Sequence, residues 1–176
     1  MSYIANLGTE WADYTDKHKE MREIVEKRVN DFLVGNKPNP LAIRGPFGQG
    51  KTQLLFHIFK YTWHKGGVAF YTTLDRLLPK EEMGPSDFAN HVDSLISQSL
   101  HKLKSGNLDE VYLLPYQSLK DYVSAKLKDS TTKQDKAVLL LDEMEQSYKK
   151  LLRTVKTDDR SPFRDWLDNT PNFPIA

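Results

Sequence analysis

Apolar positions recur at helical spacing in several segments of the chain. The first predicted helix covers residues 9–34, with Thr9 as its cap and charged residues opposite its apolar face. Further helices are predicted over 51–63, 86–104, 116–128, from Met144 onward, and after Ser161-Pro162. In the helix from Met144, the positions expected to face inward are Met144, Tyr148, Leu151, Leu152 and Val155.

Between these helices lie short runs that are typical of buried strands. Residues 68–73 are rich in β-branched and aromatic side chains, and residues 137–141 are continuously apolar. Residues 41–44 are a third candidate, directly before a glycine-rich turn. Because strands alternate with helices, the sequence predicts a parallel α/β sheet whose ligands would lie at the carboxyl ends of the strands.

Composition narrows the class of protein. The 176 residues suffice for one domain with a substantial core, and 25 basic against 24 acidic residues give no global attraction to nucleic acid or an anionic membrane. The absence of cysteine excludes disulfides, a thiolate nucleophile, zinc–cysteine sites and iron–sulfur clusters, and the five histidines lack the spacing of metal ligands. Neither a signal-peptide pattern nor a membrane-spanning apolar run is evident, so we expect a cytoplasmic protein with no membrane partner.

The glycine-rich turn carries the clearest chemistry. The run Gly45-Pro46-Phe47-Gly48-Gln49-Gly50-Lys51-Thr52 fits the pattern G-x-x-x-x-G-K-[ST] between a predicted strand and a predicted helix. Glycines let the backbone turn tightly and approach phosphate oxygens, while N–H groups at a helix N-terminus favour an anion. Lys51 would contact the β- and γ-phosphates, Thr52 would ligate Mg²⁺, and Gln53 would complete the nucleotide contacts. The alternative is a chance match in a glycine-rich turn.

The second chemical element is the run Val138-Leu139-Leu140-Leu141-Asp142-Glu143. Carboxylates that end an apolar strand are costly unless they emerge at the edge of the sheet and meet a cation. Asp142 would hold Mg²⁺, directly or through water, and Glu143 would orient or deprotonate the water that attacks the γ-phosphate. The alternative is a buried strand followed by an ordinary helix whose first turn favours acids. Glu143 and Lys51 are therefore the candidate catalytic residues.

These two elements carry a family resemblance. Gly45–Thr52 resembles a Walker A motif and Val138–Glu143 a Walker B motif. The pair resembles P-loop NTPases that have an added strand and a catalytic glutamate, and the layout is most similar to AAA+ ATPases of the origin-recognition-like and STAND-like branches. The resemblance implies a three-layer α/β/α P-loop core over residues 41–176, after an N-terminal helix and linker over 1–40. It also implies ATP rather than GTP as ligand, Mg²⁺ as cofactor, and self-association through the core.

The resemblance further implies elements that the 176 residues do not supply. In AAA+ proteins a fourth strand carries a polar sensor residue, and an arginine finger and a helical lid follow it. Because Phe173-Pro174-Ile175-Ala176 lie where that strand would begin, we expect a core truncated near the fourth strand, without a lid.

Three functions compete on this evidence. One is a Mg²⁺-dependent ATPase that couples hydrolysis to conformational change. Another is a nucleotide-gated switch with little turnover, of STAND type, in signalling or phage defence. The third is a small-molecule kinase, which the adjacent Asp142-Glu143 pair argues against.

Weaker signals lie outside the two motifs. One of them is a basic helix face, which is explained by exposure to solvent or, as the alternative, by contact with DNA or a neighbouring subunit. Its residues are Lys149, Arg153, Lys156 and Arg160. Another lies at the end of strand 68–73, where a side chain could position water or cap the strand; the candidates are Thr72, Thr73 and Asp75.

Overall fold

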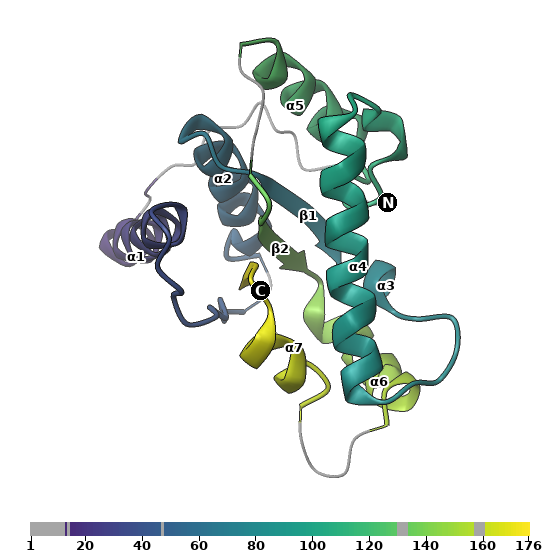
Figure 1. The fold of residues 1–176 in the computed structure, drawn as a ribbon. Coiled ribbons are helices and arrows are strands. Elements are labelled where there is room, and N and C mark those ends of the chain that lie inside the picture. The colour runs from purple at the N-terminus through teal and green to yellow at the C-terminus, as the bar shows by residue number, and fades with distance from the viewer. Residues whose placement is uncertain (1–12, 14, 47, 130–133, 157–160) are drawn as a thin grey trace.

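A parallel three-stranded sheet lies at the centre of the protein. The computed structural model describes residues 13, 15–46, 48–129, 134–156 and 161–176. The sheet has the order β1-β2-β3, and its strands are Ala69–Thr73, Val138–Asp142 and Phe173–Ile175 (Figure 1). Ala69 pairs with Val138, which pairs in turn with Phe173. The predicted α/β class with a parallel sheet is therefore confirmed.

The segment before the glycine-rich turn lies beside β3. Leu41 forms an isolated parallel bridge with Ile175. The Leu41 N–H donates to the Pro174 carbonyl at 3.3 Å, and the Ala176 N–H donates to the Leu41 carbonyl at 3.0 Å. Of the strand predicted over 41–44, the structure shows this single bridge, and the Ile43 N–H also donates to the Ala176 carbonyl. The position of this segment next to the sheet is nonetheless clear.

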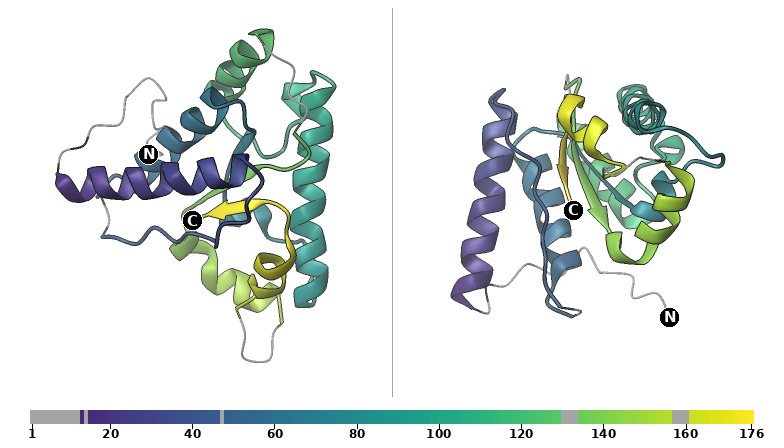
Figure 2. Two further views of the ribbon diagram at one scale, coloured as in Figure 1. Left: turned by 60° about the vertical axis from the view of Figure 1, so that its left-hand side comes forward. Right: turned by 90° about the horizontal axis from the view of Figure 1, so that it is seen from below.

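Helices cover both faces of the sheet (Figure 2). Those on one side are α1 (Asp16–Leu33) and α2 (Lys51–His64), and those on the other are α4 (Pro85–Lys104), α6 (Met144–Thr154) and α7 (Arg164–Asn169). The remaining helical elements connect strands and helices; they are α3 (Leu74–Leu77), η1 (Leu108–Glu110) and α5 (Gln117–Asp129). None of the helices within the described ranges is long and apolar enough to cross a membrane.

The first helix begins later than predicted. Thr15 caps α1, because its hydroxyl accepts a hydrogen bond from the His18 N–H at 3.2 Å, and Asp13 and Thr15 are not helical. The predicted cap Thr9 lies outside the described residues. Near its other end, α1 packs Phe32 on Phe173 of β3, with ring centroids 5.7 Å apart. The predicted division of the chain at residue 40 stays a prediction.

Helix α6 buries less of its surface than expected. Leu151 and Val155 are buried as predicted, and Met144 is half-buried. Tyr148 and Leu152, which were also expected to face inward, are 37% and 47% exposed. The difference arises because α6 packs mainly against the short helix α3, which covers only a narrow stripe of it.

A partly buried polar cluster ties the second helical layer to the sheet. Asp93 of α4 accepts hydrogen bonds at its Oδ1 from Trp166 Nε1 (2.7 Å), Thr170 Oγ1 (2.8 Å) and Asn172 Nδ2 (3.3 Å). Asn172 Oδ1 in turn accepts the Ala137 N–H at 2.9 Å, just before β2. The cluster therefore fixes the entry of the chain into β3 beside β2.

Residues 111–114 cover the outer edge of β1. The Tyr71 N–H donates to the Leu113 carbonyl at 3.1 Å, and Leu113 and the nearby Val111 and Leu114 are buried. This pairing satisfies backbone groups that an open strand edge would expose. It also brings Tyr116, which comes shortly after this segment, close to β1, with its ring centroid 5.8 Å from that of Tyr71.

Candidate functional site

The glycine-rich turn leads directly into α2. Gly48 and Gly50 have φ angles of +82° and +78°, which side chains rarely adopt, so glycine is strongly favoured at both positions. Gly50 is the N-cap of α2, and no side chain caps this helix start. The first N–H groups of α2 are therefore oriented toward the turn, where an anion would find both donors and the positive end of the helix dipole. Phe47 lies outside the described residues.

Lys51 folds its side chain back over the turn. Its Nζ donates to the Gly45 carbonyl at 2.6 Å and to the Pro46 carbonyl at 3.2 Å. These carbonyls hold the ammonium group beside the start of α2. A phosphate oxygen could replace them as the acceptor, because it offers a stronger, charged partner.

Asp142 ends β2 and is 9% exposed. Its Oδ2 accepts hydrogen bonds from Thr52 Oγ1 at 2.7 Å and from the Tyr71 hydroxyl at 2.8 Å. Its Oδ1 accepts the Glu143 N–H at 2.9 Å. All three donors are uncharged, so they satisfy the buried carboxylate while leaving its negative charge available to a cation.

Tyr71 is a residue of this site that sequence reasoning missed. It is 2% exposed, and its ring stacks on Phe56 of α2 with centroids 4.7 Å apart. Burial, followed by the charge of Asp142, holds the pKa of Tyr71 well above its ordinary value. The only sequence signal was a phenol hydroxyl within a predicted buried strand.

Glu143 adopts an uncommon backbone conformation. Its φ of 55° and ψ of 34° are left-handed, and it is the only non-glycine residue with positive φ in the described part of the chain. Such a conformation is strained for a side chain longer than asparagine, and residues of this kind cluster at functional sites. The side chain is exposed. Burial and then the charges of Glu143 and Asp142 raise the pKa of Tyr116, which places Tyr116 in the same electrostatic environment.

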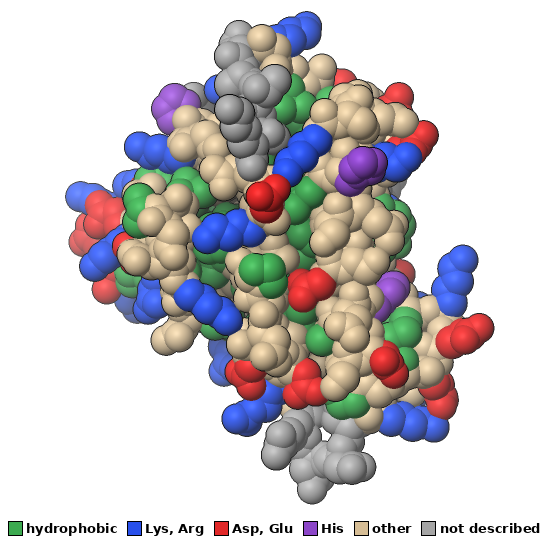
Figure 3. All heavy atoms as spheres, viewed as in Figure 1, with side chains coloured by type: hydrophobic (Ala, Val, Ile, Leu, Met, Phe, Trp, Pro, Cys, Tyr) green, Lys and Arg blue, Asp and Glu red, His purple; other side chains and the backbone are tan. Residues whose placement is uncertain are grey.

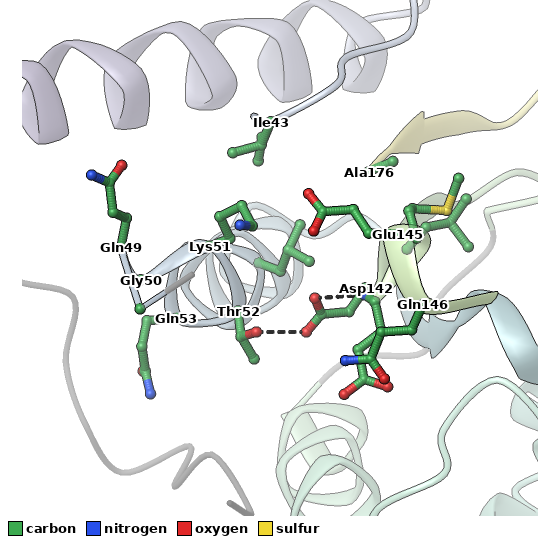
Figure 4. Close-up of a pocket in the computed structure, with 15 residues that line it drawn as sticks. Ile43, Gln49, Gly50, Lys51, Thr52, Gln53, Asp142, Glu145, Gln146 and Ala176 are labelled. Atoms are coloured by element: carbon green, nitrogen blue, oxygen red, sulfur yellow. Dashed lines mark hydrogen bonds between the residues drawn. The ribbon is translucent and has the colours of Figure 1, made fainter. Parts of the chain in front are cut away.

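A cavity of about 550 Å³ lies between the turn and the start of α6. Its wall includes Gly48 to Gln53, Asp142 and Glu143, so most of the residues predicted from the two motifs meet there. Figure 4 shows Thr52 and Asp142 facing each other, and Glu145 extending from α6 toward the side of the cavity where Lys51 lies. Gln49 and Gln53 extend away from Asp142 in opposite directions. The motif spacing indicated neither Glu145 nor the wall residues Ile43 and Ala176.

The side-chain oxygens at this site fit Mg²⁺ bound together with phosphate. Within the described residues, no group of three or more His, Asp or Glu side chains could hold a metal by itself. Mg²⁺ takes oxygen ligands and usually keeps waters and substrate phosphates beside one or two protein groups. Thr52 Oγ1 and Asp142 Oδ2 lie 2.7 Å apart and offer two such oxygens at the edge of the cavity.

The weaker candidates lie elsewhere. Thr72 is buried and its hydroxyl donates to the Thr73 carbonyl at 3.4 Å, while Asp75 forms an ion pair of 2.8 Å with Lys150 of α6. Within the predicted basic face, Lys156 lies just after α6 and pairs with Glu82 at 2.6 Å, and Arg160 lies outside the described residues. Thr72, Asp75 and Lys156 therefore have partners within the chain.

Comparisons with protein-family models, curated proteins and solved structures return no match for this chain.

Proposed function

We propose that this protein binds ATP with Mg²⁺ at the carboxyl end of its sheet and hydrolyses the bond between the β- and γ-phosphates. The hydrogen bond of 2.7 Å between Thr52 and Asp142 carries the proposal. It joins the glycine-rich turn to the acidic end of β2 across 90 residues of sequence, and so unites the two elements that phosphoryl chemistry requires.

The order of the sheet gives further support. β3 lies between the segment that leads into the turn and β2, which carries Asp142. This arrangement supports the proposal, because the resemblance to AAA+ ATPases implies an added strand between these two. The positive φ angles of Gly48 and Gly50 support the same reading, because they shape the turn as a concave backbone surface at a helix start.

Each residue would then have a distinct task. The N–H groups at the start of α2 and the Lys51 ammonium group bind the β- and γ-phosphate oxygens. Thr52 and Asp142 would hold Mg²⁺, which when bound offsets the negative charge of the phosphates. Glu143 accepts a proton from water as the water oxygen bonds to the γ-phosphorus and the bond to the β-phosphate oxygen breaks. ADP and inorganic phosphate are the products.

Titration with ATP tests the binding step. Lys51→Ala is expected to weaken ATP binding about tenfold or more, because a charged hydrogen-bonding partner of the phosphates is lost. The matched control is Lys80→Ala, which removes an exposed lysine in the loop before α4. Equal ATP affinity of Lys51→Ala and Lys80→Ala would overturn the proposal, as would a parent protein that binds no ATP.

Phosphate release tests the chemical step. Glu143→Gln is expected to retain ATP binding and to slow hydrolysis about 10²- to 10⁴-fold, the usual contribution of a general base. Hydrolysis at the parental rate would show that Glu143 has another role. ATP binding by a parent protein without phosphate release would favour the nucleotide-gated switch. Transfer of phosphate to a nucleoside or sugar would favour the small-molecule kinase.

A macromolecular partner stays a prediction. On the face shown in Figure 3, basic and acidic side chains are interspersed. Such a surface lacks the single sign of charge that phosphate-backbone binding needs, so this face offers no support for a DNA partner.

A further inference from the structure

We propose that Tyr71 is a positioning residue that holds the Asp142 carboxylate in the orientation required for Mg²⁺. The inference rests on the proposed function and deepens it. Tyr71 belongs to neither sequence motif, but its hydroxyl lies 2.8 Å from Asp142 Oδ2.

Both carboxylate oxygens of Asp142 accept hydrogen bonds, and one of these bonds comes from Tyr71. Oδ2 accepts from Tyr71 and from Thr52, and Oδ1 accepts the Glu143 N–H. Rotation of the carboxylate about its own axis would break these bonds in a site where Asp142 is only 9% exposed, so water could not readily replace them. The hydrogen bonds therefore select one orientation of the carboxylate.

The position of the Tyr71 hydroxyl is itself fixed from three sides. The residue belongs to β1, its N–H is bonded to the Leu113 carbonyl at 3.1 Å, and its ring stacks on Phe56 at 4.7 Å with an interplanar angle of 21°. Phe56 lies one turn after Thr52, on the same face of α2. One helix face thus presents a hydroxyl to Asp142 and an aromatic ring to the tyrosine that holds Asp142.

The chemistry of a phenol suits this task. Asp142 and Thr52 would both be needed for Mg²⁺, whereas Tyr71 can donate a hydrogen bond to Asp142 without being a ligand. A phenol is ordinarily protonated throughout the neutral range, so the Tyr71 hydroxyl can serve as the donor in its hydrogen bond to Asp142. Partners of this kind, which orient metal ligands from behind, typically contribute 10- to 100-fold to metal affinity or activity.

Tyr71→Phe tests the inference, because it removes the hydroxyl and preserves the ring on Phe56. ATP affinity is measured for the full chain at saturating Mg²⁺ and in EDTA, together with the Mg²⁺ concentration that gives half-maximal ATP binding. We expect this concentration to rise about tenfold, with the affinity for ATP in EDTA unchanged. The matched control is Tyr61→Phe, which loses a hydrogen bond of 2.8 Å with Asn30 between α1 and α2.

The outcomes separate this inference from the proposed function. A parent protein that binds no ATP overturns both. A parent that binds ATP, with Tyr71→Phe and Tyr61→Phe showing the same Mg²⁺ dependence, overturns only the role of Tyr71. Equal loss of affinity with Mg²⁺ and in EDTA would show a purely structural role and also overturn it. If Tyr71→Phe does not fold, Phe56→Leu weakens the support behind the ring and is expected to shift the Mg²⁺ dependence in the same direction; an unchanged dependence would contradict the inference.

Discussion

The hydroxyl of Thr52 lies 2.7 Å from Oδ2 of Asp142, although the two residues are 90 positions apart in the chain. Thr52 is in the first turn of α2 and Asp142 is the last residue of β2. Their contact follows from the parallel sheet, which brings the carboxyl end of β2 and the turn after residues 41–44 to the same edge.

This contact predicts different effects for two substitutions of Thr52. Thr52→Val keeps the shape but removes the donor, and we expect a loss of about 1–3 kcal/mol in the free energy of unfolding without nucleotide. Thr52→Ser keeps the hydroxyl and should stay close to the parent in unfolding and in Mg²⁺-dependent ATP binding. Urea unfolding and ATP titration measure the two effects. Equal behaviour of the valine and serine variants would contradict the importance of this hydrogen bond.

The left-handed backbone at Glu143 predicts a conflict between stability and activity. Glu143→Gly should be about 1 kcal/mol more stable than Glu143→Ala, because glycine adopts a φ of 55° without strain. Both variants should lose hydrolysis. Glu145 provides the control within α6, where Gly should instead be about 1 kcal/mol less stable than Ala. Chemical unfolding of the four variants is the measurement, and the same sign at both positions would exclude strain at Glu143.

Tyr116 should report the charge of Glu143. Burial and then the negative charges of Glu143 and Asp142 raise the pKa of Tyr116 above its ordinary value of 10.0. The stability that this group contributes is therefore complete below pH 10 and is lost as the pH rises through the folded-state pKa. Glu143→Gln removes one charge, so the pKa of Tyr116 should fall toward 10.0.

NMR of isotope-labelled tyrosine, assigned with Tyr116→Phe, follows this titration directly. Glu145→Gln is the control, because Glu145 lines the same cavity but is not among the causes of the shift. An unchanged Tyr116 pKa in Glu143→Gln would show that the two side chains are not electrostatic neighbours.

The cluster around Asp93 should contribute strongly to stability. Asp93→Ala leaves the donors of Trp166, Thr170 and Asn172 without their acceptor, and we expect a loss of about 2–4 kcal/mol in the free energy of unfolding. Asp87→Ala, at an exposed position in the first turn of α4, should cost less than about 1 kcal/mol. Urea unfolding compares the two. Similar losses in both variants would contradict a role for the cluster in positioning β3.

Local patterns were sufficient for much of the fold. The apolar runs 68–73 and 137–141 predicted β1 and β2 to within one residue, and helical spacing predicted α2, α4 and α5. The pattern was weaker where an element is short or peripheral. It did not resolve α3 or η1, and it placed Tyr148 and Leu152 of α6 inward, because spacing alone does not tell how wide a stripe the neighbouring elements cover.

The sequence by itself determined the turn and the chemistry available in it. Glycines at positions 48 and 50 permit the left-handed backbone of the turn. Lys51 supplies a positive charge, and Thr52 and Asp142 supply oxygen atoms that could bind a metal ion. Only the tertiary structure decided that Tyr71 and Thr52 share one oxygen of Asp142 and that Glu145 lines the same cavity as Lys51. These contacts depend on strand order and on the rotation of each helix about its axis, which join residues far apart in the chain and leave no periodic signal in the sequence.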